Sequence, residues 1–393
     1  MRSVARIITK RLYIYLLKEM TYLFLLSLVI LTFIMVMSRI GRLTDFIINR
    51  GVELKDILLL ILYSSPPFLT FTLSMAFLLS TIVVFGRFSA ENEILALKAN
   101  GINLKWLILP VAIFGLFITC FGILNTHIFL PRSGELFKDT LINIVKKGIS
   151  VDEREGVFND TIPGVVIYID KIDPKSKTLT GVFVSDERSS EIKQTISAHT
   201  GRILLDPDSL NLNFLLKDGN LHRWEVKEGV YRNLTFKTYT YSMNLETIVP
   251  TGVPLRKRAY EMSWDELRLK ASQAKGKDRY EWLLEIYKRF SIPLLSLAFV
   301  FLTIPLGIRR RHEGKFSGIA YSLLIFVMYY LLMALTEHIG EVLGLMPLIT
   351  AFVPDIIVLL IGIWLIKDIN EEVSQDPLLR LKGIWRVVFE KVR

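Results

Sequence analysis

The chain has 393 residues, of which 51% are hydrophobic and 22% charged, and its mean hydropathy is +0.42, a mixture that favours membrane spans joined to a sizeable water-facing part. Its formal charge of +10 does not require a nucleic-acid partner, because basic residues also collect beside membranes on the cytoplasmic side. The single cysteine, Cys120, excludes an intrachain disulfide.

Six apolar runs are long enough to cross a membrane, since a span needs about 20 apolar residues for a core of about 30 Å. They cover residues 20–38, 57–85, 106–129, 290–308, 319–335 and 348–366. The first run follows a basic stretch, like a signal peptide, but it is long and has no small-residue cleavage site, so we expect a retained span. The pair Pro66-Pro67 should kink or break the second span and leave carbonyls that need new partners.

Residues 86–104 form a short polar segment with helical periodicity between the second and third spans. Ser89 stands where a helix cap is expected, and Asn92 stands where a capping box has Glu or Gln. Ala90, Ile94 and Leu97 lie on one side, and we expect that apolar stripe to need a soluble partner or the membrane surface.

This segment suits a coupling helix, which docks on an ATP-hydrolysing subunit and transmits its closure to the spans. Glu93 is the expected charged contact, because an acid in the first turn also favours the helix dipole. The predicted contact residues are Ala90, Glu91, Glu93, Ile94, Leu97 and Gly101. The alternative is an amphipathic connector lying on the bilayer.

The insert at residues 131–262 changes to the alternating pattern of strands. Strands are expected at residues 165–170, 179–185, 195–205, 210–216, 221–226 and 231–244, with a hairpin turn at 217–220. Short strands at close spacing predict an all-β sandwich or jelly roll. A helix is expected before it at 135–147, and another after it opens at Ser263 with Glu266 completing a capping box.

The predicted fold is therefore an α-helical membrane protein with six transmembrane helices and an inserted all-β, jellyroll-like domain. Its parts are residues 1–130, with three spans and the coupling segment; 131–262, the β domain; and 263–393, with a connecting helix, three spans and a tail. Lys and Arg gather at the N-terminus, in residues 86–105 and after the fourth span. The positive-inside rule then predicts both termini in the cytoplasm and the β domain outside.

Signatures of catalysis are missing from the sequence. It has no GxxxxGK[ST] and no HExxH, and its five histidines show no metal-ligand spacing, so no metal site is predicted. We find no ionisable residue clearly in the middle of a span, which disfavours an ion-coupled carrier, and an enzyme still more.

Two stretches, ENEILALKANGI at residues 91–102 and YKRFSIPLLSLAFVFLTIPLGIRRR at 287–311, resemble the LptF/LptG permeases of bacterial lipopolysaccharide export. The layout of nearly the whole chain is similar to this family, and the motif at the fourth span is more like the LptF half. The resemblance implies an inner-membrane permease that pairs with an LptG-like permease and with two copies of an LptB-like ATPase. ATP and Mg²⁺ would bind in that ATPase, and no cofactor in this chain. Lipopolysaccharide would pass from a cavity between the permeases to jellyroll partners like LptC and LptA.

Arg39 and Arg42 lie three residues apart at the outer end of the first span, where positive residues are scarce. Arginine forms forked bonds with phosphate, so we predict that they bind the phosphates of lipopolysaccharide, with Arg132 as a weaker third candidate. The alternative is that these side chains reach ordinary lipid headgroups.

Two other functions stay open at this point. The first is a mechanotransmission subunit of another ABC system, for which four spans are expected. The second is a membrane-anchored β-domain scaffold, for which no ATPase should co-purify.

Overall fold

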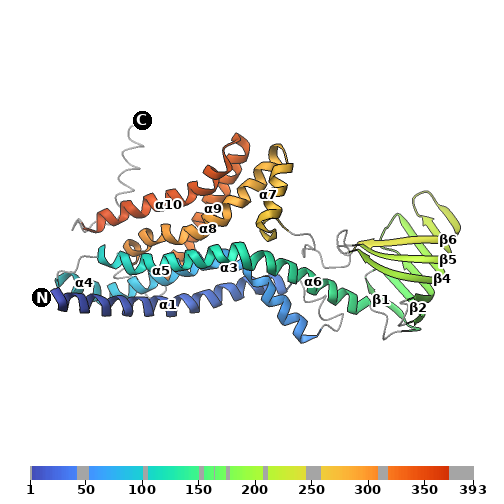
Figure 1. Cartoon of the computed structure of the whole chain (residues 1–393), viewed down its shortest axis with the longest axis horizontal. Coiled ribbons are helices and arrows are strands. Elements are labelled where there is room, and N and C mark those ends of the chain that lie inside the picture. Colours follow the sequence, from blue (N-terminus) through green and yellow to red (C-terminus); the bar gives the residue numbers. More distant parts are fainter. Residues whose placement is uncertain are drawn as a thin grey trace. The chain divides into compact units, whose positions relative to one another are not determined.

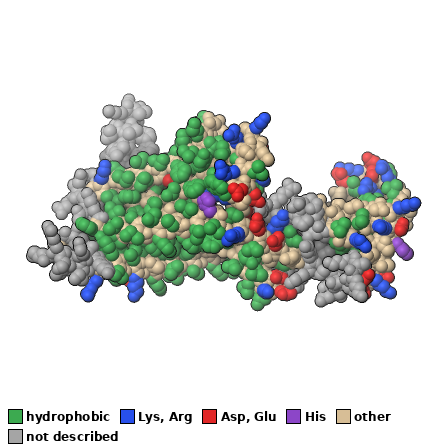
Figure 2. Space-filling model, in the orientation of Figure 1, with side chains coloured by type: hydrophobic (Ala, Val, Ile, Leu, Met, Phe, Trp, Pro, Cys, Tyr) green, Lys and Arg blue, Asp and Glu red, His purple; other side chains and the backbone are tan. Residues whose placement is uncertain are grey.

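The computed structural model describes residues 2–41, 53–100, 105–149, 155–162, 164–173, 178–206, 211–244, 258–308 and 317–370. Within them, six helices are long and apolar enough to cross a membrane, as predicted. They begin with α1 (Arg2–Ile40), α3 (Leu54–Ala90) and α5 (Lys105–Leu124), and continue with α8 (Gly276–Ile308), α9 (Ser317–Leu343) and α10 (Pro347–Asn370) (Figure 1). On the face drawn in Figure 2, hydrophobic side chains cover most of the helical surface.

The chain divides into two compact units. The first, called the helical unit here, combines Met1–Thr32, Leu69–Ile128 and Ser263–Arg393. The second, called the β unit, combines Phe33–Phe68 with Phe129–Met262.

Several helices extend beyond the apolar runs that predict them. The α8 helix begins at Gly276, so the amphipathic stretch before the fourth span and the span itself are one helix. The α5 helix passes through a π-helical turn, η1 (Asn125–Phe129), directly into α6 (Leu130–Ile149). The helix expected at 135–147 is therefore the continuation of the third span.

The proline pair does not break the second span, because α3 runs through Pro66 and Pro67 as one helix. Pro66 has no N–H to donate to the carbonyl of Leu62, four residues earlier. The hydroxyl of Ser65 donates to that carbonyl instead, at 2.7 Å. The serine before the prolines thus supplies the partner that the freed carbonyl needs.

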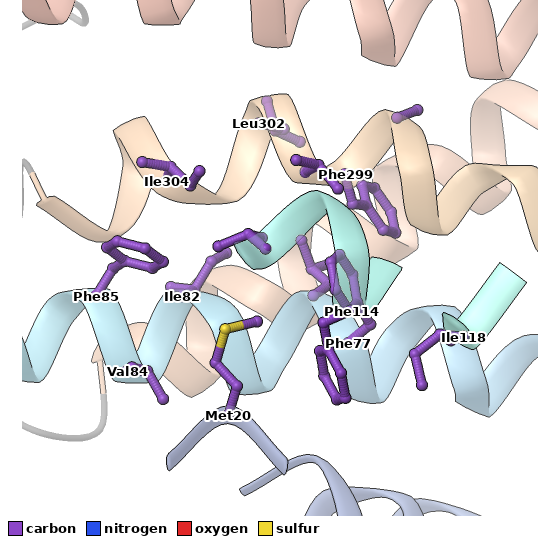
Figure 3. Close-up of a cluster of buried hydrophobic side chains, with 14 of the residues drawn as sticks. Met20, Phe77, Ile82, Val84, Phe85, Phe114, Ile118, Phe299, Leu302 and Ile304 are labelled. Carbon is purple, nitrogen blue, oxygen red and sulfur yellow. The ribbon is translucent and has the colours of Figure 1, made fainter. Parts of the chain in front are cut away.

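The core of the helical unit lies where α3 packs between α1 and α8. Figure 3 shows Phe77, Ile82 and Phe85 of α3 between Met20 of α1 and the Phe299-to-Ile304 stretch of α8. Polar contacts also cross this core, since the hydroxyls of Ser74 on α3 and Ser296 on α8 lie 3.0 Å apart. The α8 helix is thereby buried among other helices.

The helix after the β domain begins as predicted. At the start of α7 (Trp264–Gln273), the Ser263 hydroxyl accepts a hydrogen bond from the backbone N–H of Glu266 at 3.2 Å. The backbone N–H of Ser263 donates in turn to the Glu266 carboxylate at 2.7 Å. Both halves of the capping box are present.

The inserted domain is all-β, as predicted, and its described strands form one six-stranded antiparallel sheet in chain order (Figure 1). The strands are β1 (Phe158–Ile162), β2 (Val165–Asp173), β3 (Thr178–Asp186), β4 (Ile192–Asp206), β5 (Asn211–Glu225) and β6 (Val230–Asn244). Their apolar side chains join those of α6 in one buried cluster. The sequence missed β1, which is short and carries few apolar residues.

The hairpin predicted at residues 217–220 is wrong, because β5 continues through it. Asp218 adopts the left-handed conformation, with φ 52°, and is left out of the register on both sides. Lys217 and Gly219 on either side of it keep the same register with β4 and with β6, so the strand passes through Asp218 without an inserted residue. A Cβ at Gly219 would collide with the carbonyl oxygen of Ser197, so this glycine permits close strand approach and does not make a turn.

Candidate functional site

The polar segment between the second and third spans contains a short helix, α4 (Glu93–Ala99). It begins after a sharp turn at Asn92, whose φ of 61° is left-handed. The expected cap at Ser89 is wrong, because α3 continues to Ala90 and carries Ser89 inside its last turn. The Ser89 hydroxyl instead donates to the Ile308 carbonyl at the end of α8, at 2.6 Å.

The helix ends that lead into α4 pack very closely. At Gly307 of α8, a Cβ would lie 2.5 Å from the Cβ of Phe85 and 3.3 Å from the backbone nitrogen of Gly86. Only a residue without a side chain permits this approach of α3 and α8. Together with the bond from Ser89, it holds the end of α3, from which the chain turns into α4, against the end of α8.

The two faces of α4 have different surroundings. Ile94 is only 4% exposed, and Leu97 packs against the buried cluster of the helical unit. The prediction that the apolar stripe needs an external cover is therefore wrong for these two residues, since the chain covers them itself. The opposite face exposes Glu91, Leu95 and Lys98, and Leu95 is 53% exposed although it is apolar.

The α1 helix also contacts this segment. The Tyr15 ring stacks on Phe88, with centroids 5.4 Å apart and planes 5° from parallel. The Tyr15 hydroxyl donates to Glu93 Oε1 at 3.4 Å. One helical turn along α1, Glu19 Oε2 lies 3.1 Å from Nη2 of Arg87.

The remaining predicted site residues are placed as follows. Ala90 and Glu91 are exposed, and Glu93 is half-buried. Arg132 is exposed near the start of α6. Gly101 and Arg42 lie outside the described residues, as does the side chain of Arg39.

One ionisable residue in a span escaped the sequence reasoning. Asp355 lies well inside α10 and is 7% exposed. Its carboxylate accepts hydrogen bonds from Ser291 of α8 at 2.5 Å and from Tyr329 of α9 at 2.9 Å. The prediction that no ionisable residue lies clearly in the middle of a span is thus wrong. The signal was a single acid within an apolar run.

Among the described residues, no group of three or more His, Cys, Asp or Glu side chains is arranged to hold a metal ion. At the end of α3, the chain forms a short helix that packs on the core helices with one face and exposes the other.

Comparison with known proteins gives the family. The model of the lipopolysaccharide export system permease LptF/LptG matches residues 14–368. The chain belongs to the LptF/LptG family. It is also 21% identical over 282 residues to the uncharacterized protein RP871 of Rickettsia prowazekii (strain Madrid E), covering 71% of this chain and 77% of that protein.

Membership of the LptF/LptG family implies a lipopolysaccharide export permease. Such a permease is a transport subunit that crosses the membrane several times. The six apolar helices in the described residues agree with this family and not with a four-span mechanotransmission subunit. The family model covers both halves of the permease pair, so the closer likeness to LptF stays a prediction.

Proposed function

We propose that this chain is one permease subunit of an ABC transporter that extracts lipopolysaccharide from the bacterial inner membrane and passes it to a periplasmic bridge toward the outer membrane. The observation that carries the proposal is the family match across residues 14–368. In this proposal ATP and Mg²⁺ bind to a separate LptB-like ATPase, present in two copies, and this chain carries no cofactor.

The α4 helix is the proposed contact with the ATPase. Glu93 lies in its first turn, Ala90 and Glu91 lie in the turn that leads into it, and the exposed Leu95 offers an apolar contact. Ile94 and Leu97 act from the inner face by holding α4 on the core helices. Because Ser89 bonds to the end of α8, a push on α4 would reach α3 and α8 together. Gly101 is proposed as the end of this helix.

An LptG-like permease is the proposed second subunit. In the most apolar stretch of α3 and of α8, 72% of the residues are buried. The corresponding share is only 22% in α1 and 17% in α9. Poorly buried apolar helices are available to lipid or to a partner's helices. A cavity between two such subunits would hold the lipid.

Arg39, Arg42 and Arg132 are the proposed contacts with the lipopolysaccharide phosphates. The exposure of Arg132 is compatible with this role. Arginine pairs with phosphate through two parallel hydrogen bonds, which makes these side chains suitable ligands.

The proposed topology places both termini in the cytoplasm and residues 131–262 in the periplasm as a separate domain. There, LptC-like and LptA-like proteins would continue the bridge by strand addition. Of the two edges of the described sheet, β6 offers 15 residues and β1 only five, so β6 is the proposed docking edge.

The test is affinity purification of the full chain from its native membrane, followed by identification of bound protein and lipid. We expect an LptB-like ATPase and lipopolysaccharide to co-purify. Glu91→Lys should remove the ATPase while the chain still inserts, because Glu91 is exposed and its reversal places a positive charge beside the helix N-terminus.

Asp265→Lys is the matched control, since Asp265 is an exposed acid in the first turn of α7. It should leave the ATPase bound. Purification of the wild-type chain without any ATPase would overturn the proposed function. Retention of the ATPase by Glu91→Lys would remove only the contact proposed for Glu91.

A further inference from the structure

The contacts between α1 and the α4 segment have no role in the function proposed above. They involve Tyr15 and Glu19 of α1, Arg87 and Phe88 of α3, and Glu93 of α4. We call these five residues the clasp. All of them belong to the helical unit.

The clasp is a connected set of contacts. Tyr15 stacks on Phe88 and also donates to Glu93, so one side chain touches the end of α3 and the start of α4. Arg87 lies beside the same ring, with its guanidinium carbon 5.5 Å from the Phe88 centroid, and forms the ion pair with Glu19. The two side chains of this ion pair are 37% and 27% exposed, so water partly screens their attraction.

A second tyrosine of α1 reaches the other end of the segment. The Tyr13 hydroxyl donates to the carbonyl of Trp106, at the start of α5, at 3.1 Å. Tyr13 and Tyr15 thus hold the connection between α3 and α5 from both ends. The rest of α1 is held along one face, where Leu16, Met20 and Phe24 are buried in the core, while most of its apolar stretch is not buried.

We propose that the clasp, with Tyr15 as its central positioning residue, transmits a displacement of α4 to α1, so that α1 moves with the coupling helix when the ATPase acts. This inference rests on the proposed function. An individual exposed hydrogen bond or ion pair contributes little to stability. The clasp therefore matters for the position of α1 relative to α4, and its loss should leave the fold intact.

The first experiment measures that position directly. Spin labels at Ile14→Cys on α1 and Lys98→Cys on α4, both exposed sites, are introduced in a Cys120→Ser background. In lipid nanodiscs the distance distribution should be narrow for the otherwise wild-type chain. Tyr15→Leu should broaden it, because both the stack and the hydrogen bond are lost. Tyr22→Leu, an exposed tyrosine on the same helix, is the matched control and should leave the distribution narrow.

The second experiment measures coupling in the complete complex. For Tyr15→Leu we expect ATP hydrolysis near the wild-type rate but about 3- to 10-fold less lipopolysaccharide released per ATP, the size expected from an aromatic contact. Tyr15→Phe keeps the stack and should lose about 2- to 3-fold. Glu19→Arg should also uncouple the complex, and the exchange Glu19→Arg with Arg87→Glu should restore much of the loss. A purely structural role predicts instead that hydrolysis and release fall together.

The outcomes separate the two proposals. A narrow distance distribution for Tyr15→Leu would show that the clasp does not fix α1, whatever the function of the complex. Broadening with an unchanged ratio of lipid released to ATP hydrolysed would overturn the transmission role. A wild-type chain that binds neither ATPase nor lipopolysaccharide would overturn the proposed function itself, and the transmission role with it.

Discussion

Two buried aspartates, one in each unit, are held by a tyrosine in nearly the same way. Asp186 ends β3 and Asp355 lies in α10, and each is 7% exposed. The hydroxyl of Tyr241 donates to Asp186 at 2.8 Å, and that of Tyr329 donates to Asp355 at 2.9 Å. The two sites differ in the second donor.

In the sheet the second donor is a cation, whereas in the helices it is a hydroxyl. Arg188 binds Asp186 through Nε at 2.8 Å and Nη2 at 2.7 Å, while its side chain stays 27% exposed. Asp355 is bonded instead to Ser291. A charge within a span costs about 2.5–3.5 kcal/mol on insertion scales, so a second ionisable group there adds to the cost, and neutral donors avoid it. These two aspartates are thus compensated differently, Asp186 by a cation and a hydroxyl and Asp355 by two hydroxyls.

The largest expected effect follows from removing the cation. Arg188→Leu should destabilise the β unit by about 2–3 kcal/mol, because Asp186 stays buried with its charge no longer compensated. Infrared spectra of the full chain in detergent follow the β-sheet band during heating. Arg223→Leu, whose guanidinium bonds Gln194 and pairs with no carboxylate among the described contacts, is the control and should lower the midpoint less. Equal losses would show that the ion pair has no special part.

A second effect appears as the pH falls. Burial by itself raises the pKa of Asp186, but the bonds from Arg188 and Tyr241 outweigh it and lower the pKa from 3.8 to about 2. A carboxyl group whose pKa is lower in the folded state than in the unfolded state stabilises the fold at pH values above the unfolded-state pKa. This stabilisation is lost as the pH falls through the folded-state pKa.

The stabilisation from Asp186 should therefore be complete above pH ~4 and be lost between pH ~4 and ~2, by about 2 kcal/mol. The measurement compares the β-sheet midpoints of the wild type and Asp186→Asn at several pH values. Their difference should shrink in that window. A difference that is constant with pH would contradict the lowered pKa.

The smallest effect comes from the two tyrosines. Tyr329→Phe should cost about 1–1.5 kcal/mol, because Asp355 keeps only one side-chain donor, whereas Tyr241→Phe should cost about 0.5–1 kcal/mol, because Arg188 remains. The helix and sheet bands in the same heating experiment report the two units separately. Tyr330→Phe, at an exposed neighbouring position, should be silent. A larger loss for Tyr241→Phe would reverse the comparison.

Hydrophobicity determined most of the architecture. The apolar runs gave all six spans in the described residues, and alternation gave the positions of β2, β3, β4 and β6. These features depend on one residue's chemistry and its near neighbours, as does the capping box at Ser263. Predictions from neighbouring residues failed where contacts with residues far away in the sequence decide the structure. The Asp218-Gly219 pair is typical of a turn, but here it lies inside β5, where the register with β4 is the same on both sides of it and Gly219 packs closely against Ser197.

The candidate site was only partly predictable. The sequence located α4 and the acid of its first turn, Glu93, because polarity within an apolar region is a local signal. It placed Ser89 in the wrong role and left Ile94 and Leu97 without a partner in the chain. It gave no indication of the clasp, since Tyr15 and Glu93 are 78 residues apart and become neighbours only when α1 packs beside α3.

The sequence by itself determined that this protein spans a membrane six times, carries an inserted β domain and belongs to a lipopolysaccharide export permease family. The tertiary structure alone decided which face of α4 is covered, how Asp355 is bonded and what holds α1 in place. The physical reason is that solvent preference is a property of each residue, whereas the partner of a side chain depends on which helices meet.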